Sequence, residues 1–400
     1  MGLVTTNVDP VAKIKVVGVG GGGCNAVNTM ITDYDIAGVD FMAFNTDAQA
    51  LKMSQAPTTL QLGEDLTKGL GVGGNAELGA QAAEESLDQV QELLEGANMV
   101  FITAGMGGGT GTGAAPIIAG VARNMGALTV AVVTKPFDFE GNKRREIAEE
   151  GIANLRDKVD TLIVVPNQRL LEVVSDSENI SFIDAMKKVD SVLAEGVNSI
   201  SNLISKTGYI NADFNDAKSV MQNAGTALMG IGRASGENRA EEAARAATTS
   251  PLLDMSIEGA TGVLYNVVGA NLSLQEISRV SDLIKEAVDP SANIKFGAQI
   301  DPEAGDELII TIVATGFDEN KQVYTTKARG DDSVPPVRDF GFGMPPSTPA
   351  PTVEDTLDSF NDRSADEVDT IMEDDTFDAI KPEDIDADDP LDVPAFMRKK

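Results

Sequence analysis

Two glycine-rich runs have the composition and spacing of phosphate-binding loops. The first is Gly18-Val-Gly20-Gly-Gly-Gly23, directly after the apolar stretch 14–19, and the second is Gly105-Met-Gly-Gly-Gly-Thr-Gly-Thr-Gly113, directly after the stretch 98–104. Glycine lets the backbone approach a phosphate closely, and a helix start offers unbonded N–H groups and the positive end of the helix dipole. The order strand, glycines, helix therefore predicts a nucleotide-phosphate site, with a tight turn of small residues as the alternative for the first run.

The second run is the stronger predictor of the two. Five glycines within the seven residues 107–113 cost about 0.5–1 kcal/mol each relative to alanine in regular structure, so a packed element gains nothing from them. Thr110 and Thr112 add hydroxyl groups, and the next helix is expected to begin at Ala114. Two phosphate-binding loops after neighbouring strands suit a di- or triphosphate, whereas a nicotinamide dinucleotide usually needs one such loop. A Walker-type loop would show a lysine after the glycines, and none is present.

The absence of histidine restricts the possible chemistry. It excludes a Ser-His-Asp triad, a Cys-His pair and any histidine metal site. Phosphoryl transfer fits this restriction because it depends mainly on positioning and electrostatics.

One acidic motif, Asn211-Ala-Asp213-Phe-Asn-Asp216, precedes a predicted helix. Its two acids could simply cap that helix.

The bulk composition indicates an acidic chain of two domains. Four hundred residues exceed the usual limit of about 250–300 for one hydrophobic core. A net charge of −32 repels phosphate backbones and argues against nucleic acid as a partner. No stretch approaches the roughly 18 consecutive apolar residues of a membrane span, and the N-terminal residues do not resemble a signal peptide. The single cysteine, Cys24, suits a reducing cytosol, so we expect a cytoplasmic protein.

The apolar pattern predicts an α/β fold with a parallel sheet covered by helices on both faces, because its strand-like runs are continuous rather than alternating. The predicted strands are 14–19, 39–44, 98–104, 128–134 and 161–166, and the predicted helices between them include 77–94 and 114–125. A long helix at 181–205 is expected either to connect two domains or to be an ordinary core helix. Its apolar stripe is Ile183, Met186, Val189, Leu193, Val197, Ile200 and Ile204.

A smaller mixed α+β domain is expected after the long helix. Its predicted strands are 226–233, 262–270, 293–300 and 307–314, and its predicted helices are 237–248 and 274–287. The expected organisation is thus a nucleotide-binding domain at 12–180, a central connecting helix at 181–206 and a mixed domain at 207–316.

The C-terminal residues have a different composition. Residues 331–397 hold 20 acidic and three basic residues, which predicts a disordered acidic linker over 317–386. The segment 387–400 combines apolar side chains with a basic tip, and is interpreted either as a short docking peptide or as a tail without a partner. Its candidate docking residues are Leu391, Val393, Pro394, Phe396 and Met397.

Taken in order, these motifs resemble those of the tubulin/FtsZ GTPase family and its bacterial FtsZ proteins. GGGTGTG at 107–113 is similar to the tubulin signature, and GGGGCNAVN at 20–28 is similar to the first phosphate loop of FtsZ. The resemblance extends from Ala12 to about Gly316 and resumes in the last dozen residues. It implies a GTPase that binds GTP or GDP with Mg²⁺, is activated by head-to-tail polymerisation, and organises the mid-cell division ring in bacterial cytokinesis.

The resemblance also implies ligand roles. The α and β phosphates would be held by Gly20, Gly21, Gly22, Gly23, Cys24 and Asn25, with Asn25 also reaching the base. The loop 69–75, with Gly71 and Gly73, would sense the γ-phosphate. The second run would cradle the β and γ phosphates through Gly107, Gly108, Gly109, Thr110, Gly111, Thr112 and Gly113. In the segment from Thr134, Glu140 and Arg144 would contact the ribose and nearby phosphates. Asn167 and Asp190 would contact guanine.

For catalysis, the resemblance implies that the acidic motif enters the nucleotide pocket of the next subunit. Asp213 and Asp216 would position the attacking water and Asn211 would orient it. Mg²⁺ would be bound mainly through the GTP phosphates, without a dedicated protein ligand. The terminal peptide would bind membrane-tethering and regulatory division proteins, with no direct membrane insertion by this chain.

The sequence departs from the family pattern at two positions, and two other functional hypotheses stay open. Met186 stands where many relatives have phenylalanine against the guanine, and Cys24 stands where glycine is frequent, so Cys24 is either a reactive thiol or a small residue that fits. A Rossmann-type NAD oxidoreductase would explain only the first glycine run, with Asn45-Thr-Asp47 as a loose match to its acidic residue. A non-hydrolysing nucleotide-binding scaffold would keep the glycines but lose Asp213 and Asp216.

Overall fold

The structure is a computed structural model, and it describes residues 12–34, 36, 38–170, 181–205, 213–250 and 256–317. All of them lie in the first of two units, 1–328 and 329–400, into which the chain divides. Asn211, the predicted linker from residue 318 onward and the docking peptide at 387–400 therefore lie outside the described residues.

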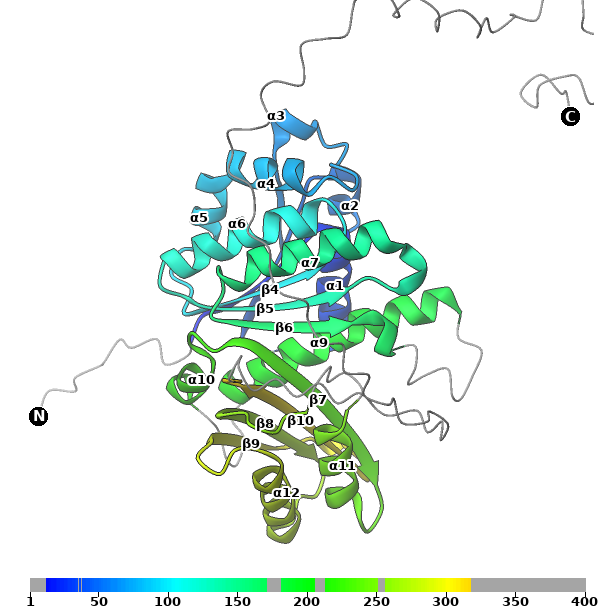
Figure 1. Cartoon of the computed structure of the whole chain (residues 1–400), viewed down its shortest axis with the longest axis vertical. Helices are drawn as coiled ribbons and strands as arrows, with labels where there is room; N and C mark the ends of the chain where they lie inside the picture. The colour runs from blue at the N-terminus through cyan, green and yellow to red at the C-terminus, as the bar shows by residue number, and fades with distance from the viewer. Residues whose placement is uncertain are drawn as a thin grey trace, which may run out of the picture. The chain divides into compact units, whose positions relative to one another are not determined.

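Six parallel strands form one part of a ten-stranded sheet, in the order β3-β2-β1-β4-β5-β6 (Figure 1). The central strands are buried along almost their whole length, as expected for continuous apolar runs covered on both faces. The strands are β1 Ile14–Val19, β2 Val39–Asn45, β3 Thr58–Gln61, β4 Met99–Gly105, β5 Leu128–Lys135 and β6 Thr161–Pro166.

Alternate side chains of these strands enter two apolar clusters on opposite faces of the sheet. One cluster includes Val16 and Val132 and residues of α1 (Gly20–Asp33) and α9 (Phe182–Ser205). The other includes Val17 and Val133 and residues of the helices α4 Ala76–Glu85, α5 Leu87–Leu94, α6 Thr110–Asn124 and α7 Asn142–Arg156. Short helices fill the connections: α2 Ala48–Lys52, α3 Glu64–Thr67 and η1 Asp138–Glu140.

The helix predictions were less accurate than the strand predictions. The helix expected from Ala114 begins at Thr110, and α1 begins at Gly20, so both glycine runs form first helical turns. The helix expected over 77–94 is two helices that meet at Ser86. Helix α7 was not predicted, because its sequence is highly charged and only four of its residues are buried.

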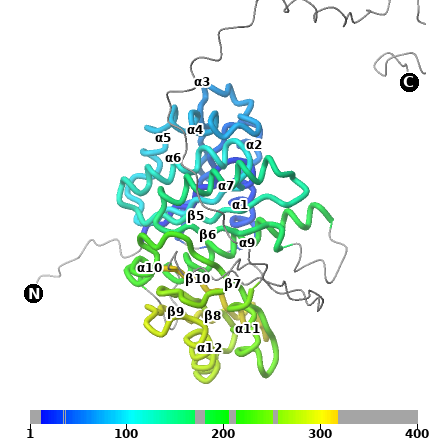
Figure 2. The backbone as a smooth tube through the Cα atoms, in the orientation of Figure 1, coloured from blue at the N-terminus to red at the C-terminus, as the bar shows by residue number. Residues whose placement is uncertain are grey.

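The long helix α9 packs beside α1 on one face of the sheet and contacts both β5 and the later strand β8 (Gly262–Gly269; Figure 2). Its predicted stripe is buried from Val189 to Ile200. The prediction is wrong at Ile183, which is 66% exposed because the first turn of α9 extends beyond the core.

The remaining strands make a mixed sheet that continues the parallel one. β7 starts parallel to β6, with Thr161 opposite Gly225, and then runs antiparallel to β10. The order β7-β10-β8-β9 completes the ten strands. The elements are α10 Phe214–Met221, β7 Gly225–Ser235, α11 Arg239–Thr248, β8 Gly262–Gly269, α12 Leu274–Ala287, β9 Asn293–Ile300, η2 Pro302–Ala304 and β10 Glu307–Thr315. The predicted fold class, a parallel α/β part followed by a mixed part, is confirmed.

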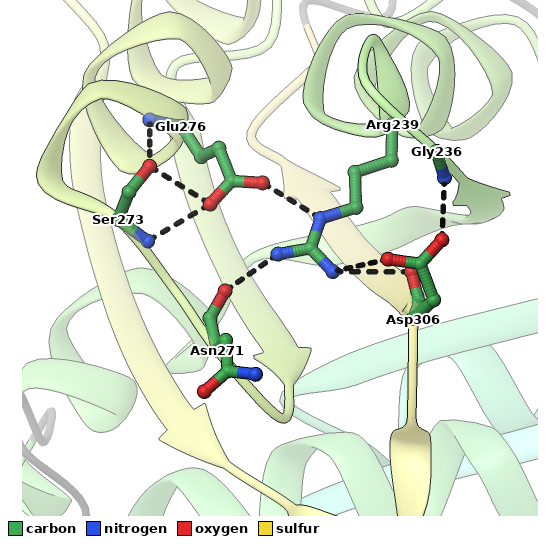
Figure 3. A network of polar contacts seen from close by, with 6 residues as sticks. All are labelled: Gly236, Arg239, Asn271, Ser273, Glu276 and Asp306. Atoms are coloured by element: carbon green, nitrogen blue, oxygen red, sulfur yellow. Dashed lines mark hydrogen bonds and ion pairs between the residues drawn. The ribbon is translucent and has the colours of Figure 1, made fainter.

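A buried arginine joins the elements of this mixed part (Figure 3). Arg239, at the start of α11, donates from Nε to Glu276 on α12 at 2.6 Å. Its two terminal nitrogens donate to the backbone carbonyls of Asn271 and Asp306. Because each guanidinium nitrogen has a protein partner, this network is a structural link rather than a ligand site. Among the described residues, no helix is long and apolar enough to cross a membrane.

Candidate functional site

The order of the parallel strands creates one position where a ligand crevice is expected. From β1 the chain moves to β2 on one side, and from β3 it returns to β4 on the other side of β1. Connections that leave in opposite directions open a crevice at the carboxyl ends of the two central strands. Gly20 directly follows β1, and the loop that begins at Gly105 ends β4, so the two glycine runs meet at this crevice.

Two helices begin side by side in the crevice. Gly20 has φ +71°, and a Cβ placed on it would lie 2.8 Å from the backbone nitrogen of Gly111, so no other residue fits without displacing the second loop. The first N–H groups of α1 and α6 have no partners within their own helices, and both helix dipoles are positive at this end. Gly21 faces open space. This arrangement suits a phosphate chain held from two sides.

The loop 69–75 is attached to the same site. The N–H of Gly109 donates to the carbonyl of Gly73 at 3.1 Å, and the N–H of Gly71 donates to the carbonyl of Thr46 at 3.2 Å. The hydroxyls of Thr46 and Thr110 lie 2.7 Å apart. The structure therefore brings together the three predicted phosphate loops, at Gly20, at Gly71 to Gly73 and at Gly107 to Gly113.

Thr46 was missed by the sequence analysis. It is fully buried and directly follows a buried strand within the polar triplet Asn45-Thr46-Asp47, which was the available signal. Asp47, the loose candidate for a ribose acid in a dinucleotide enzyme, accepts from the N–H groups of Gln49 and Ala50 and caps α2 instead. The dinucleotide alternative therefore loses its acidic residue to a structural role.

The threonine hydroxyls of the second run form hydrogen bonds within the protein, which stabilise the loop. The Thr112 hydroxyl accepts from the N–H of Gly107 at 2.9 Å and the side chain is buried. Thr110 is paired with Thr46. The N–H groups of Gly107 and Gly109 also have protein partners, so the donors left for a ligand are the other backbone N–H groups at the start of α6.

Glu140 and Arg144 border the second run. Arg144 donates from Nε to the carbonyl of Gly107 at 3.4 Å and is ion-paired with Glu140. Both residues line an open hollow of about 1250 Å³ that also includes Gly107 and Gly108. The structure thus places a cation and a carboxylate beside the phosphate loop. Thr134 lies buried at the end of β5, the next strand.

Cys24 belongs to the core and not to the ligand surface. Its thiol is 3% exposed and points to the carbonyls of Gly18 and Phe44. Burial raises the pKa of the thiol to about 12, with a hydrogen bond to Asn45 acting in the opposite direction. Since the thiolate is the reactive form, the interpretation of Cys24 as a reactive thiol is not supported.

Asn167 and Asp190 are the two residues predicted to contact a nucleobase. Asn167 is 7% exposed, and its Oδ1 has no hydrogen-bond partner among the described residues. Asp190, on α9, has its pKa raised to about 7 by burial. A buried acceptor without a partner costs about 1–3 kcal/mol, so a ligand that donates a hydrogen bond would stabilise Asn167. Guanine offers N–H donors of this kind.

The predicted catalytic acids lie elsewhere. Asp213 caps α10, because its Oδ1 accepts from the N–H of Asp216 at 2.8 Å. The carboxylate of Asp216 lies 2.6 Å from Nζ of Lys295 on β9. The structure thus shows the capping role that composition favours and separates both acids from the phosphate loops of the same chain. Within the described part of the chain, no group of three or more acidic or cysteine side chains is arranged to hold a metal ion.

Comparisons with known proteins agree with this geometry. Residues 13–175 match the GTPase domain of the Tubulin/FtsZ family, and residues 225–318 match the FtsZ family C-terminal domain. An empty FtsZ dimer from M. jannaschii is 44% identical over 76% of this chain and 88% of that chain, with a TM-score of 0.73. A point mutant of the same FtsZ gives 44% identity, 77% and 92% coverage and a TM-score of 0.74.

A more distant structure shares the fold alone. CetZ2 from Haloferax volcanii, solved as a GTPγS-bound protofilament, is 21% identical over 78% of this chain and 95% of that chain, with a TM-score of 0.66. The matching domains, the identity to FtsZ and the double glycine site all lead to the same conclusion. The chain belongs to the FtsZ family and is a GTPase of the tubulin/FtsZ fold.

Proposed function

We propose that this GTPase assembles head to tail into filaments and that each subunit's Asp213 and Asp216 act on the GTP bound by its neighbour. One observation carries the proposal: the phosphate loops and the acids occupy opposite edges of the sheet. The loops follow the carboxyl ends of β1 and β4. Helix α10, which carries the acids, lies along the amino ends of β6 and β9.

The position of α10 follows from its contacts at both ends. Asp160, just before β6, accepts from the N–H groups of Asn223 and Gly225, immediately after α10. β9 points in the same direction as β6 through the pairings β6–β7, β7–β10, β10–β8 and β8–β9. Lys295 is the third residue of β9, so its contact with Asp216 also lies at the amino edge. In Figure 1, α10 accordingly lies near the ends from which β4, β5 and β6 start.

The distance between the edges supports cooperation between subunits rather than within one subunit. β5 spans Leu128–Lys135, which at about 3.3 Å per residue is roughly 20–25 Å. A carboxylate must come within hydrogen-bond reach of the water that it orients, directly or through one further water. This separation favours action on a neighbour's nucleotide, because head-to-tail stacking would bring one edge against the other.

The chemistry assigned to this interface follows the available groups. Phosphoryl transfer to water requires an oriented nucleophile and neutralised phosphate charge. In the proposal, Asp213 and Asp216 position the water, Asn211 orients it, and Arg144 and the helix N-termini hold the phosphates. Mg²⁺, bound mainly through the phosphates, would supply the remaining positive charge.

The cellular part of the proposal rests on family membership. The filaments would organise the mid-cell division ring in bacterial cytokinesis, in the cytoplasm. The peptide at 387–400, on the acidic linker 317–386, would bind membrane-tethering and regulatory division proteins without inserting into the membrane itself. The segments 12–180, 181–206 and 207–316 would act as the GTP-binding domain, the connecting helix and the domain that presents the acids.

Phosphate release at increasing protein concentration tests the proposal. We expect a GTP-specific rate per molecule that rises above a threshold concentration, together with sedimentable polymer, and little release with ATP. A rate per molecule that stays constant with concentration would mean that each subunit hydrolyses its own nucleotide, and would refute the shared site.

A further inference from the structure

Helix α10 is fastened to the amino edge of the sheet at both ends. At its C-terminal end the carbonyl of Val220 accepts from the hydroxyl of Thr315 at 2.9 Å, and the carbonyl of Met221 accepts from the hydroxyl of Thr161. Near its N-terminal end Asp216 is ion-paired with Lys295 of β9 at 2.6 Å. The C-terminal end of α10 is therefore held by two strand hydroxyls, and the acidic end has a charged contact with β9.

The two acids have different local roles. Asp213 uses one oxygen as the helix cap, so the turn of α10 itself orients it. Asp216 receives one hydrogen bond from the backbone of Asp213, and its other contact comes from outside the helix. Its side chain is 34% exposed and is held by Lys295, which is itself 33% exposed and comes from β9. Without that ammonium group the Asp216 side chain would keep only its hydrogen bond with the backbone of Asp213, and its rotamer would be less restricted.

We propose that Lys295 is a positioning residue for hydrolysis: it fixes one carboxylate oxygen of Asp216 and leaves the other for the water that attacks the neighbour's GTP. This inference rests on the proposed function. A fixed carboxylate loses less entropy when it orders the water, which is the advantage of a preorganised group.

Charge gives Lys295 a second effect. The chain has a net charge of −32, and assembly brings two carboxylates toward a triphosphate. A cation beside Asp216 offsets part of that repulsion. The hydrogen bond from Lys295 and its charge also lower the pKa of Asp216, with a smaller contribution from the hydrogen bond to Asp213. Asp216 thus stays ionised, as a carboxylate that orients water must be, to a lower pH than a free aspartate.

Among the charged side chains around α10, Lys295 is the one that lowers the pKa of Asp216. Lys218 lies on α10 itself, two residues after Asp216. The elements in contact with α10 carry other titratable side chains, none of which contributes to the lowered pKa of Asp216. They are Tyr265 on β8, Lys135 on β5, and Asp184, Lys187, Lys188, Asp190 and Glu195 on α9.

The test compares Lys295→Met with Lys295→Arg in the full chain, with Lys285→Met as the matched control. Lys285 is exposed on α12. For Lys295→Met we expect GTP affinity in the unassembled protein to stay within twofold, and turnover per assembled subunit to fall about tenfold. The acid limb of the pH–rate profile should move to higher pH. Lys295→Arg should recover most of the turnover, and Lys285→Met should behave as wild type. An unchanged kcat and an unchanged acid limb in Lys295→Met would overturn the inference.

Asp216→Asn separates this inference from the proposed function. If Asp216→Asn keeps full turnover in filaments, the proposed role of the acids is wrong. If Asp216→Asn is inactive while Lys295→Met turns over normally at every pH, only the role of Lys295 is wrong. Should Lys295→Met fail to fold, Lys295→Gln gives the same comparison, because it keeps a hydrogen-bond donor without the charge.

Discussion

The hydroxyl oxygens of Thr46 and Thr110 lie 2.7 Å apart and join the end of β2 to the first residue of α6. The carbonyl of Thr46 also accepts from the N–H of Gly71, in the loop 69–75. One buried threonine therefore holds two of the three phosphate loops in register, and the nucleotide cradle depends on a side chain that does not need to touch the nucleotide.

Thr46→Val should weaken GTP binding without unfolding the protein. The substitution keeps the shape but removes the hydroxyl and leaves Thr110 without its partner, which costs about 1 kcal/mol. We expect a roughly fivefold increase in the Kd for GTP, measured by fluorescent-nucleotide titration. Thr59→Val, at an exposed position on β3, is the control and should bind as wild type. Equal affinities for all three proteins would show that the hydroxyl pair does not order the cradle.

Two glycines of α6 provide a matched pair. A Cβ on Gly113 would lie 1.9 Å from the carbonyl oxygen of Ala76 on α4, whereas a Cβ on Gly120 would make ordinary contact with Lys158 at 3.9 Å. Gly113→Ala should therefore push α4 away from the phosphate loop and lower both the melting temperature and GTP affinity. Gly120→Ala should raise stability by up to about 1 kcal/mol, because alanine is the better helix former. Thermal unfolding of both variants measures the difference; a Gly113→Ala protein as stable as wild type would contradict the close packing of α4 on α6.

The sequence predicted the strands well because their signal is local. Each buried strand is a continuous apolar run, and β9 and α12 match their predicted bounds. The glycine runs identified the phosphate loops for the same reason. Their helical first turns were missed, because propensity assigns glycine to loops, whereas here close contacts with neighbouring backbone require it.

The contacts that complete the site are not local and could not be predicted from composition. Thr46 pairs with Thr110 across 64 residues, and Lys295 meets Asp216 across a similar separation. In the sequence, Lys295 has no feature that marks it among other strand residues, and Thr46 has none that marks it as the partner of Thr110. Only the order of strands in the sheet brings these side chains together, and that order depends on packing of the whole chain.

Asp190 predicts a pH dependence of nucleotide binding. Burial raises its pKa to about 7 in the free protein, and the carboxylate must be ionised to accept the N–H donors of guanine. GTP affinity should therefore fall as pH drops below 7, by about tenfold at pH 6 relative to pH 8. Asp190→Asn should bind GTP more weakly at pH 8 and lose most of this dependence. Isothermal titration at several pH values tests this; a wild-type affinity that is flat between pH 6 and 8 would contradict it.

The same residue predicts an opposite trend for stability. Asp190 has a higher pKa in the folded protein than in the unfolded chain, where it lies near 4, so the folded state binds more protons between these values. The contribution of Asp190 to stability therefore falls as pH rises from about 4 to about 7. Without nucleotide, Asp190→Asn should be more stable than wild type above pH 7, with the difference disappearing near pH 4. Urea unfolding at pH 5 and pH 8 measures it.

Asp213 offers the sharpest test of the shared site, because its structural and chemical roles can be separated. Asparagine caps a helix about as well as aspartate, so Asp213→Asn should keep the hydrogen bond to the N–H of Asp216 and leave α10 in place. Alanine removes the cap as well, at about 0.5–2 kcal/mol. If the carboxylate acts on the neighbouring GTP, Asp213→Asn should fold and bind GTP as wild type but lose hydrolysis in filaments.

Mixing the Asp213→Asn variant with wild type then tests whether Asp213 acts on the nucleotide of its own subunit or on that of the neighbour. Each variant subunit still offers an intact nucleotide site but presents a defective acid to its neighbour. Turnover at a fixed total concentration should fall in the mixture, because wild-type nucleotide sites that face a variant subunit are inactive, and GTP should persist in the polymer. In an equal, randomly mixed filament only the nucleotides that face a wild-type neighbour are hydrolysed, whichever subunit binds them. The readout is therefore the GTP that remains on the wild-type subunits, which is identified by photo-crosslinking the nucleotide to the wild-type chain. GTP retained there shows that Asp213 acts on the neighbouring subunit's nucleotide. GTP retained only on the variant subunits would instead place Asp213 at its own nucleotide.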